Sequence, residues 1–261
     1  MSEDRVDKIL LRQFPELTRS KVQSLIGKQK ILVKKSDQWM PLTKPGQKFN
    51  TDEDIQFKVL HDEEIDYVSR GALKLKKAVE TFSLEIKDLI CLDIGLSTGG
   101  FTDYLLKSQA KKVLGVDVGS EQLHLSLRDH KQLVWKDKIN ARNPISEDIL
   151  EDFFKDETSQ HSFDLVVIDV SFISLELVAP HLKNYINVSG SVIALVKPQF
   201  ELSRSDLNKK GVVKDPDMIP LVLEKISRVF AENGLKVMDN CLSPIEGENG
   251  NQEVLILAQH L

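Results

Sequence analysis

Apolar positions from about residue 70 to the end of the chain alternate between short runs and helical spacing. The runs predict strands at 89–92, 112–119, 132–136, 163–169, 191–196, 235–238 and 254–258. Helical patterns lie between them at 101–109, 120–128, 146–155, 175–186 and 216–233. This alternation indicates an α/β, Rossmann-like fold with a mostly parallel seven-stranded sheet covered by helices on both faces. Because only a loop joins the last two strands, the last strand is expected to be antiparallel.

The first sixty residues follow another pattern, which predicts a small α+β domain at 1–60. Apolar spacing predicts two helices, the first ended by Pro15 and the second capped by Thr18 with Ser20 and closed by Gly27. Strands are predicted at 31–33, 39–42 and 55–60. The acidic segment 61–68 has no apolar period and is predicted to be a linker, which leaves 69–261 for the large domain. Leu75, Ala78 and Val79 predict a helix at the start of that domain.

Charge is distributed unevenly between the two predicted domains. The 261 residues carry a net charge of −5, but the first 50 hold 11 Lys+Arg and 5 Asp+Glu, so this arm is +6 and the remainder −11. A basic arm on an acidic body is typical of local contact with nucleic acid, although a charged helix surface is more often simply solvated. The residues expected to contact RNA are Arg5, Lys8, Arg12, Arg19, Lys21, Lys28, Lys30 and Arg70.

Composition favours a cytoplasmic protein with no membrane contact, since no window approaches 18 consecutive apolar residues and the first ten residues are too charged for a secretory signal. Cys91 and Cys241 form neither a disulfide framework nor a C-x-x-C pair. The histidines show no ligand spacing, so no metal site is expected. Nothing in the sequence predicts a stable protein partner.

The segment LICLDIGLSTGGFTDY (89–104) predicts a strand, a glycine-rich turn and the start of a helix. Its glycines do not have the G-x-G-x-x-G spacing of dinucleotide sites, and no Gly-Lys-Ser/Thr follows. The segment resembles the first motif of S-adenosylmethionine-dependent methyltransferases; a nucleotide site and simple close packing remain alternatives. The residues predicted to contact the methyl donor here are Asp93, Gly95, Ser97, Thr98, Gly99, Gly100, Phe101 and Thr102.

Asp117 follows Asp93 by 24 positions, at the end of the second predicted strand. A carboxylate there can accept both ribose hydroxyls of an adenosine cofactor, while the alternative is a helix cap. Val118, Asn140 and Asp169 complete the predicted donor site.

Four charged residues are expected to meet at the carboxyl edge of the parallel sheet, where ligands of open α/β sheets bind. Asp169 and Lys197 end two strands, Glu253 begins the reversed last strand, and Lys74 lies near the start of the helix before the first strand. Each residue alone could be a solvated charge, a cap or an edge-strand charge. Their convergence favours a catalytic site.

Two resemblances extend these predictions. The pattern RVDKIL…TRSKVQSLI…KPGQK in residues 5–48 resembles the S-four RNA-binding domain, although Lys34–Asp37 replaces its usual Val-Asn-Gly-like turn. Nearly the whole chain resembles the TlyA family, which joins an S-four domain to an FtsJ-like, class I methyltransferase domain and includes members labelled hemolysins. The matching segments include SRGALKL (69–75), IDVSFIS (168–174), LVKPQFE (195–201) and SPIEGENGNQE (243–253), with Leu96 bulkier than is usual in the glycine turn.

The TlyA resemblance implies 2′-O-methylation of cytidine in ribosomal RNA or ribosomal subunits, with S-adenosylmethionine as the donor. It also implies a catalytic Lys-Asp-Lys-Glu tetrad at Lys74, Asp169, Lys197 and Glu253, where Glu253 is chosen over Glu246 and Glu248 because it follows a Gly-Asn pair. The alternatives are an RNA-binding protein without activity and a membrane-active, hemolysin-like protein.

The reaction requires alignment of a weakly nucleophilic ribose hydroxyl and removal of one proton. Lys197 is the expected acceptor, if Lys74 and partial burial lower its pKa. Asp169 and Glu253 would orient the two amines. The long segment 199–215 is expected to be a mobile lid that brings Lys209 and Lys210 to RNA.

Overall fold

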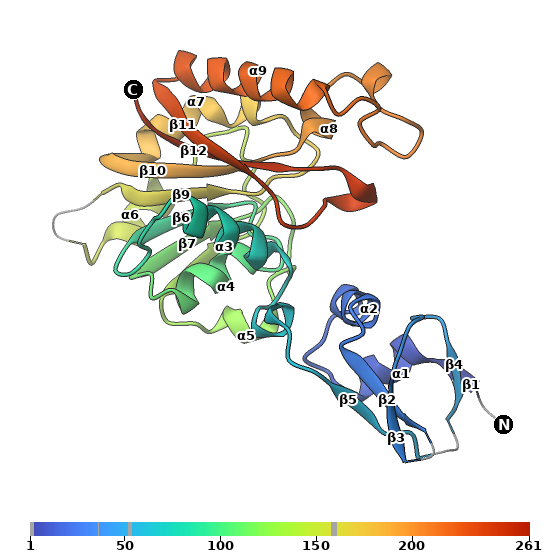
Figure 1. Ribbon diagram of the computed structural model, residues 1–261. Coiled ribbons are helices and arrows are strands. Elements are labelled where there is room, and N and C mark those ends of the chain that lie inside the picture. The colour runs from blue at the N-terminus through green and yellow to red at the C-terminus, as the bar shows by residue number, and fades with distance from the viewer. Residues whose placement is uncertain (1–2, 36, 52–53, 158–160) are drawn as a thin grey trace. The chain divides into compact units, whose positions relative to one another are not determined.

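A computed structural model describes residues 3–35, 37–51, 54–157 and 161–261. The chain divides into two compact units, Met1–Arg70 and Gly71–Leu261 (Figure 1).

The first unit contains two helices and two small antiparallel sheets. Its elements are β1 (Glu3–Arg5), α1 (Val6–Gln13), α2 (Arg19–Gly27), β2 (Ile31–Lys35), β3 (Gln38–Pro41), β4 (Lys48–Asn50) and β5 (Phe57–Val59). β1 pairs with β4, and the other strands follow the order β3-β2-β5. Thr18 caps α2 by accepting a hydrogen bond from the Lys21 amide at 3.4 Å, as predicted. β1 and β4, each of three residues, were not predicted.

The segment expected to be a linker contains a short 3₁₀ helix, η1 (Glu63–Asp66), and is bonded to the first unit. Lys28 forms an ion pair with Asp62 at 3.1 Å, and the Lys30 ammonium donates to the His61 carbonyl at 3.4 Å.

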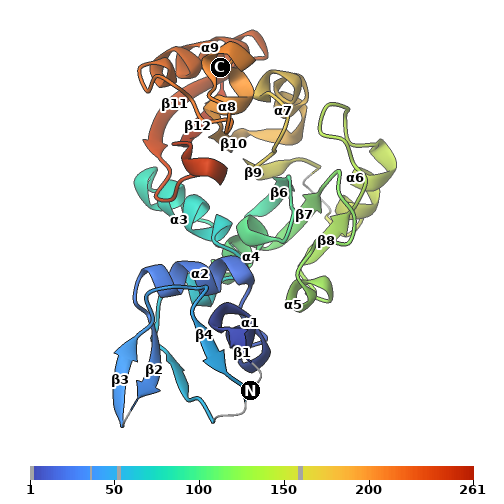
Figure 2. The same ribbon diagram turned by 90° about the vertical axis from the view of Figure 1, so that its right-hand side faces the viewer.

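The second unit is built on the seven-stranded sheet that the sequence predicts (Figures 1 and 2). Its strands are β6 (Ile90–Ile94), β7 (Lys112–Val116), β8 (Leu133–Lys136), β9 (Phe163–Ile168), β10 (Ile186–Val196), β11 (Leu235–Leu242) and β12 (Val254–His260). The order is β11-β12-β10-β9-β6-β7-β8; β12 runs antiparallel to both of its neighbours, β10 and β11, and the other neighbouring pairs are parallel. The α/β fold class, with its reversed last strand, is therefore confirmed.

Helices cover both faces of this sheet (Figure 2). α3 (Gly71–Thr81) and α4 (Gly100–Lys107) lie on one face, and α6 (Glu147–Phe154), α7 (Ala179–Tyr185) and α9 (Met218–Glu232) on the other. The second group buries Phe153, Leu182 and Phe230 in one apolar cluster with sheet residues such as Val166 and Val192. The shorter helices are α5 (Leu125–Arg128), η2 (Leu175–Leu177), α8 (Pro198–Glu201), η3 (Arg204–Asp206) and η4 (Glu248–Gly250). Within the described residues, no helix has both the length and the apolar character needed to cross a membrane.

Two predicted helices are shorter in the structure. The pattern at 120–128 forms only α5, because Glu121 has a left-handed φ of 57° and the Arg128 guanidinium binds the carbonyls of Glu121 and Leu123. The pattern at 175–186 divides into η2 and α7. Pro180 lies in the first turn of α7, where its missing N–H leaves no helical hydrogen bond unmade.

Candidate active site

The ends of four neighbouring strands meet at one edge of the large sheet. Gly95 and Asp169 directly follow β6 and β9, Lys197 follows β10, and Glu253 precedes the reversed strand β12. Because Val196 of β10 pairs with Val254 of β12, Lys197 and Glu253 occupy opposite positions on adjacent strands. The alternation of strands and helices in the sequence thus brings distant residues to one edge.

Two ion pairs occupy this edge. The Lys74 ammonium, on α3, lies 2.5 Å from Oε2 of Glu253, and the Lys197 ammonium lies 2.6 Å from Oδ1 of Asp169. Lys197 and Glu253 are buried, and their partners are partly buried. The structure therefore brings together all four residues of the predicted tetrad and gives each lysine its own carboxylate.

Ser171 adds a second contact to Lys197. Its Oγ accepts a hydrogen bond of 2.7 Å from the Lys197 ammonium. Two oxygens on the loop after β9 therefore fix the position of this amine. The sequence indicated Ser171 only as part of the segment 168–174.

Gly95 allows β6 and β9 to approach closely at this edge. Its φ of +94° is in the left-handed region, and a Cβ at this position would lie 2.5 Å from the Asp169 carbonyl oxygen. A side chain at position 95 would therefore displace the backbone that carries Asp169.

The loop before β12 is shaped around Glu253. A Cβ on Gly247 would overlap with Oε1 of Glu253, and the Gly247 amide donates to the Asn251 carbonyl at 2.9 Å. The buried Asn251 side chain reaches another segment, where it accepts from the Val213 amide and donates to the Gly211 carbonyl, each at 3.0 Å. Asn251 therefore joins the loop that carries Glu253 to residues 211–213.

The segment expected to be an irregular lid contains α8 and η3, and an isolated antiparallel β-bridge joins the backbones of Leu207 and Val213. Asn208 organises its turn by accepting hydrogen bonds from the Lys210 and Val212 amides. Its closure over a ligand remains a prediction.

A cavity of about 580 Å³ opens beside the carboxyl edge. The predicted donor residues that line it are Gly95, Ser97, Asp117, Val118, Asn140 and Asp169. Asp93, Thr98, Gly99, Gly100, Phe101 and Thr102 do not line it. Further lining residues lie at 119, 122, 141–142 and 170–173. Residues 170–173 lie in IDVSFIS (168–174), and residues 119, 141 and 142 lie in the turns VDVG (116–119) and NAR (140–142), which also resemble the TlyA family; residue 122 had no sequence signal.

Two backbone amides fix the Asp117 carboxylate at this cavity. Oδ2 accepts from the Ser97 amide at 2.8 Å, and Oδ1 accepts from the Gly119 amide at 2.7 Å. Each oxygen retains a lone pair for a further donor. The residue can therefore accept hydroxyl groups of a ligand without rearrangement.

Asp93 supports the glycine turn from inside the protein. It is fully buried, and its Oδ2 accepts a hydrogen bond of 2.6 Å from the Thr102 hydroxyl at the start of α4. Burial raises the pKa of Asp93 to about 7, although the Thr102 hydrogen bond acts in the opposite direction. Asp93 thus connects β6 to α4, and its predicted direct contact with a ligand does not fit its burial.

The unusual Leu96 in the glycine turn is also buried. A Cβ on Gly115 of β7 would lie 2.8 Å from Leu96 Cδ1, so the glycine at 115 makes room for the larger side chain at 96.

Phe172 lines the cavity and is 79% exposed, with a left-handed φ of 65°. Its ring centroid lies 5.3 Å from that of Phe200. An aromatic surface therefore lies at the cavity, one residue from Ser171.

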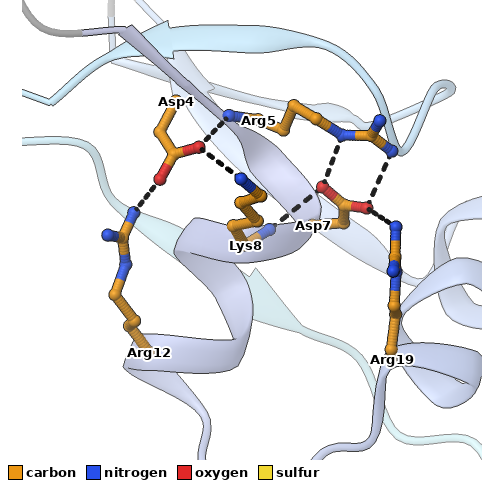
Figure 3. Close-up of polar contacts among 6 residues, drawn as sticks. All are labelled: Asp4, Arg5, Asp7, Lys8, Arg12 and Arg19. Carbon is orange, nitrogen blue, oxygen red and sulfur yellow. Dashed lines mark hydrogen bonds and ion pairs between the residues drawn. The ribbon is translucent and has the colours of Figure 1, made fainter.

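Four of the basic residues predicted to bind RNA lie together in the first unit. Figure 3 shows Arg5, Lys8, Arg12 and Arg19 around the carboxylates of Asp4 and Asp7. Lys21 differs from the prediction, because it is only 2% exposed and its ammonium donates to the Tyr67 carbonyl. It packs inside the unit and does not present its charge to a ligand.

Comparison with known proteins covers both units. The model of the family described as FtsJ-like methyltransferase matches residues 67–260. A Mycobacterium tuberculosis protein named 16S/23S rRNA (cytidine-2′-O)-methyltransferase TlyA is 35% identical over 252 residues, which cover 97% of this chain and 88% of the relative. A Campylobacter jejuni protein named 23S rRNA (cytidine-2′-O)-methyltransferase TlyA is 39% identical over 188 residues, covering 72% of this chain and 68% of the relative. A solved structure from Streptococcus thermophilus, provisionally named a hemolysin, matches with a TM-score of 0.71 and 35% identity, covering 100% of this chain and 89% of that one.

Proposed function

The chain belongs to the FtsJ-like methyltransferase family, and on this premise we propose that it methylates the ribose 2′-hydroxyl of a cytidine in ribosomal RNA, using S-adenosylmethionine. The observation that carries the proposal is the pair of ion pairs, Lys74–Glu253 and Lys197–Asp169, at one edge of the sheet beside a ligand-sized cavity. The names of the Mycobacterium and Campylobacter relatives support the nucleotide and the RNA class. A ribosomal substrate favours action in the cytoplasm.

The cavity fits an adenosine-containing donor. Asp117 offers fixed acceptors for the ribose hydroxyls, and Gly95, which has no side chain to fill the space, lines the cavity together with Asp169. When bound, S-adenosylmethionine would supply a methyl group already activated by its sulfonium. The chain's own residues then have to orient the RNA hydroxyl and manage its proton.

Lys197 is the proposed proton acceptor. Asp169 and Ser171 hold its amine at the cavity, and the neutral form of that amine can take the proton of the ribose hydroxyl. Lys74 and Glu253 form an ion pair next to Lys197. This pair holds both side chains in place at the edge of the sheet and adds no net charge to the site. Repulsion between the two lysines, which the sequence suggested as the activating effect, is countered here by a carboxylate beside each of them.

Phe172 is proposed to stack on the target base. Bases turned out of an RNA helix stack on exposed aromatic side chains, and Phe172 lies near the amine of Lys197 through their common neighbour Ser171.

The test is transfer of labelled methyl groups from S-adenosylmethionine to separately purified small and large ribosomal subunits. We expect incorporation into RNA with the wild-type protein and loss of incorporation with Lys197→Ala. Lack of transfer to either subunit or to their deproteinised RNA by a correctly folded, donor-binding protein would refute the proposal. Leakage of lipid vesicles by the same preparation would support the membrane-active alternative instead.

A further inference from the structure

Two carboxylates lie among the basic residues of the first unit, and they differ in their surroundings (Figure 3). The side chain of Asp7 is 1% exposed, whereas that of Asp4 is 24% exposed. Both are contacted by two cationic side chains. Because Asp7 is buried, its carboxylate can hold the cations around it in fixed positions.

Asp7 holds the guanidinium of Arg5 at two points. Its Oδ1 accepts from Arg5 Nε at 3.1 Å, and its Oδ2 accepts from Arg5 Nη2 at 2.9 Å. The same Oδ2 lies 3.7 Å from Nη2 of Arg19, at the start of α2. A two-point contact fixes both the position and the plane of a guanidinium, which a single contact does not.

The backbone around Asp7 is also fixed. Its amide donates to the Pro45 carbonyl at 3.2 Å, and the preceding Val6 amide donates to Gln47 at 2.8 Å. The backbone of Arg5 lies opposite that of Lys48 in the antiparallel pairing of β1 with β4. The contacts with Arg5 hold the pKa of Asp7 below its usual value, so the carboxylate stays charged at neutral pH.

The two arginines keep an outward surface. Arg5 is 44% exposed and Arg19 65% exposed, although both contact the buried carboxylate. A guanidinium has five N–H donors, so the two that Arg5 gives to Asp7 leave others for a ligand. Two guanidinium groups fixed around one carboxylate match the charge and donor requirements of a phosphate group.

We infer that Asp7 is a positioning residue for RNA recognition, which holds Arg5 and Arg19 as a preformed pair for a backbone phosphate of ribosomal RNA. The inference rests on the proposed function for the identity of the RNA. Fixing the arginines beforehand removes the entropic cost of ordering two long side chains on binding. An acidic residue thereby increases affinity for a polyanion.

Asp4 provides the matched comparison. Arg12 contacts it at 2.6 Å and Lys8 at 3.9 Å, but the carboxylate is partly exposed and makes no two-point contact with either. It therefore competes with RNA for these cations. Changing either aspartate to asparagine adds the same unit of positive charge, so simple electrostatics predicts tighter RNA binding in both variants.

The test measures affinity of the full-length protein for deproteinised ribosomal RNA at several salt concentrations. Asp4→Asn should bind as tightly as the wild type or more tightly. Asp7→Asn should bind about tenfold more weakly, because an amide keeps only one acceptor oxygen and turns its NH₂ toward a guanidinium N–H, so the two-point contact with Arg5 is lost. The slope of log K against log salt should also become less steep by about one, because one phosphate contact is lost. Tighter binding by both variants would overturn the inference.

Thermal unfolding shows whether Asp7→Asn unfolds the first unit. If it does, Arg5→Lys tests the positioning role of Asp7 instead. Lysine retains the charge but cannot make the two-point contact, so the same weakening is expected. Wild-type affinity in this variant would contradict the role of Asp7. Methyl transfer by the wild-type protein is measured separately, so RNA binding of the expected kind without transfer would reject the proposed function and leave this inference standing.

Discussion

Gly247 lies so close to Glu253 that no larger residue fits between the backbone at 247 and the carboxylate. The same carboxylate pairs with Lys74 at 2.5 Å and is buried, so it has little room to move. The absence of a side chain at 247 is therefore a condition for the Lys74–Glu253 contact.

Gly247→Ala should displace Glu253 from Lys74 and lower kcat for methyl transfer at least about tenfold, which corresponds to about 1.4 kcal/mol of transition-state stabilisation. Binding of S-adenosylmethionine, measured by calorimetry, should be nearly unchanged because the cavity lies on the other side of Lys197.

Glu253→Gln should lower kcat similarly, whereas Glu246→Gln should not. Equal effects of the two glutamine substitutions would show that Glu253 was wrongly chosen.

Asp117→Ala should weaken donor binding by about 1.5–3 kcal/mol, the contribution of hydrogen bonds to a charged group. Asp137→Ala is a suitable control, since Asp137 binds the nearby Glu121 amide but does not line the cavity. Calorimetry with S-adenosylmethionine compares the two variants. If both bind as the wild type does, the donor does not contact Asp117.

Asp93 gives the folded protein a specific dependence on pH. Its pKa is about 7 in the folded chain, raised mainly by burial, and about 3.9 in an unfolded chain. Between these values the folded state holds a proton that the unfolded state has lost, so the contribution of Asp93 to stability falls as pH rises from about 4 to 7.

Asp93→Asn removes this dependence. The free energy of unfolding of the variant, relative to the wild type, should rise by up to about 4 kcal/mol between pH 4 and 7. Urea titrations at several pH values measure it. Thr102→Val should extend the wild-type decline to higher pH, because the lost hydrogen bond favours the charged carboxylate. A constant difference between Asp93→Asn and the wild type across this range would show that Asp93 is already ionised throughout.

Lys209 and Lys210 lie on the turn that Asn251 joins to the Glu253 loop. Replacing both lysines with alanine should raise KM for ribosomal RNA about three- to tenfold and leave donor affinity unchanged, because two phosphate contacts are lost. If the turn acts through the hydrogen bonds that Asn251 makes to it, the same double substitution should have a smaller effect on kcat/KM in a protein that also carries Asn251→Ala. Strictly additive effects would indicate that the turn and the loop act independently.

The sequence predicted the large sheet and its carboxyl edge because these follow from local patterns. Apolar runs mark strands, and the parallel arrangement places Asp169, Lys197 and Glu253 together whatever their side chains contact. The pairing of each lysine with its own carboxylate was not predictable, because it depends on the β10–β12 register and on the position of α3. The same holds for Asn251, whose partners lie about 40 residues away.

Lys21 and Asp93 show a second limit of sequence patterns. Lys21 was counted with the basic surface, but its stem packs inside the first unit and its ammonium reaches a carbonyl. Asp93 lies in the donor motif, yet it acts through Thr102 from within the core. Most charged residues are exposed, but a charged residue whose hydrogen-bond partner lies inside the protein can be buried, and the sequence pattern does not show this partner.

The most direct test of the proposed function is to map 2′-O-methylated riboses in ribosomal RNA after incubation of unmodified subunits with the protein and S-adenosylmethionine. Resistance of single phosphodiester bonds to alkaline cleavage identifies the modified ribose. The wild-type protein should protect the bond 3′ of one or a few cytidines, and Lys197→Ala and Lys197→Arg should protect none while binding donor and RNA normally. Methylation on a base, on another nucleotide, or at full rate in the Lys197 variants would contradict the assigned reaction or the assigned proton acceptor.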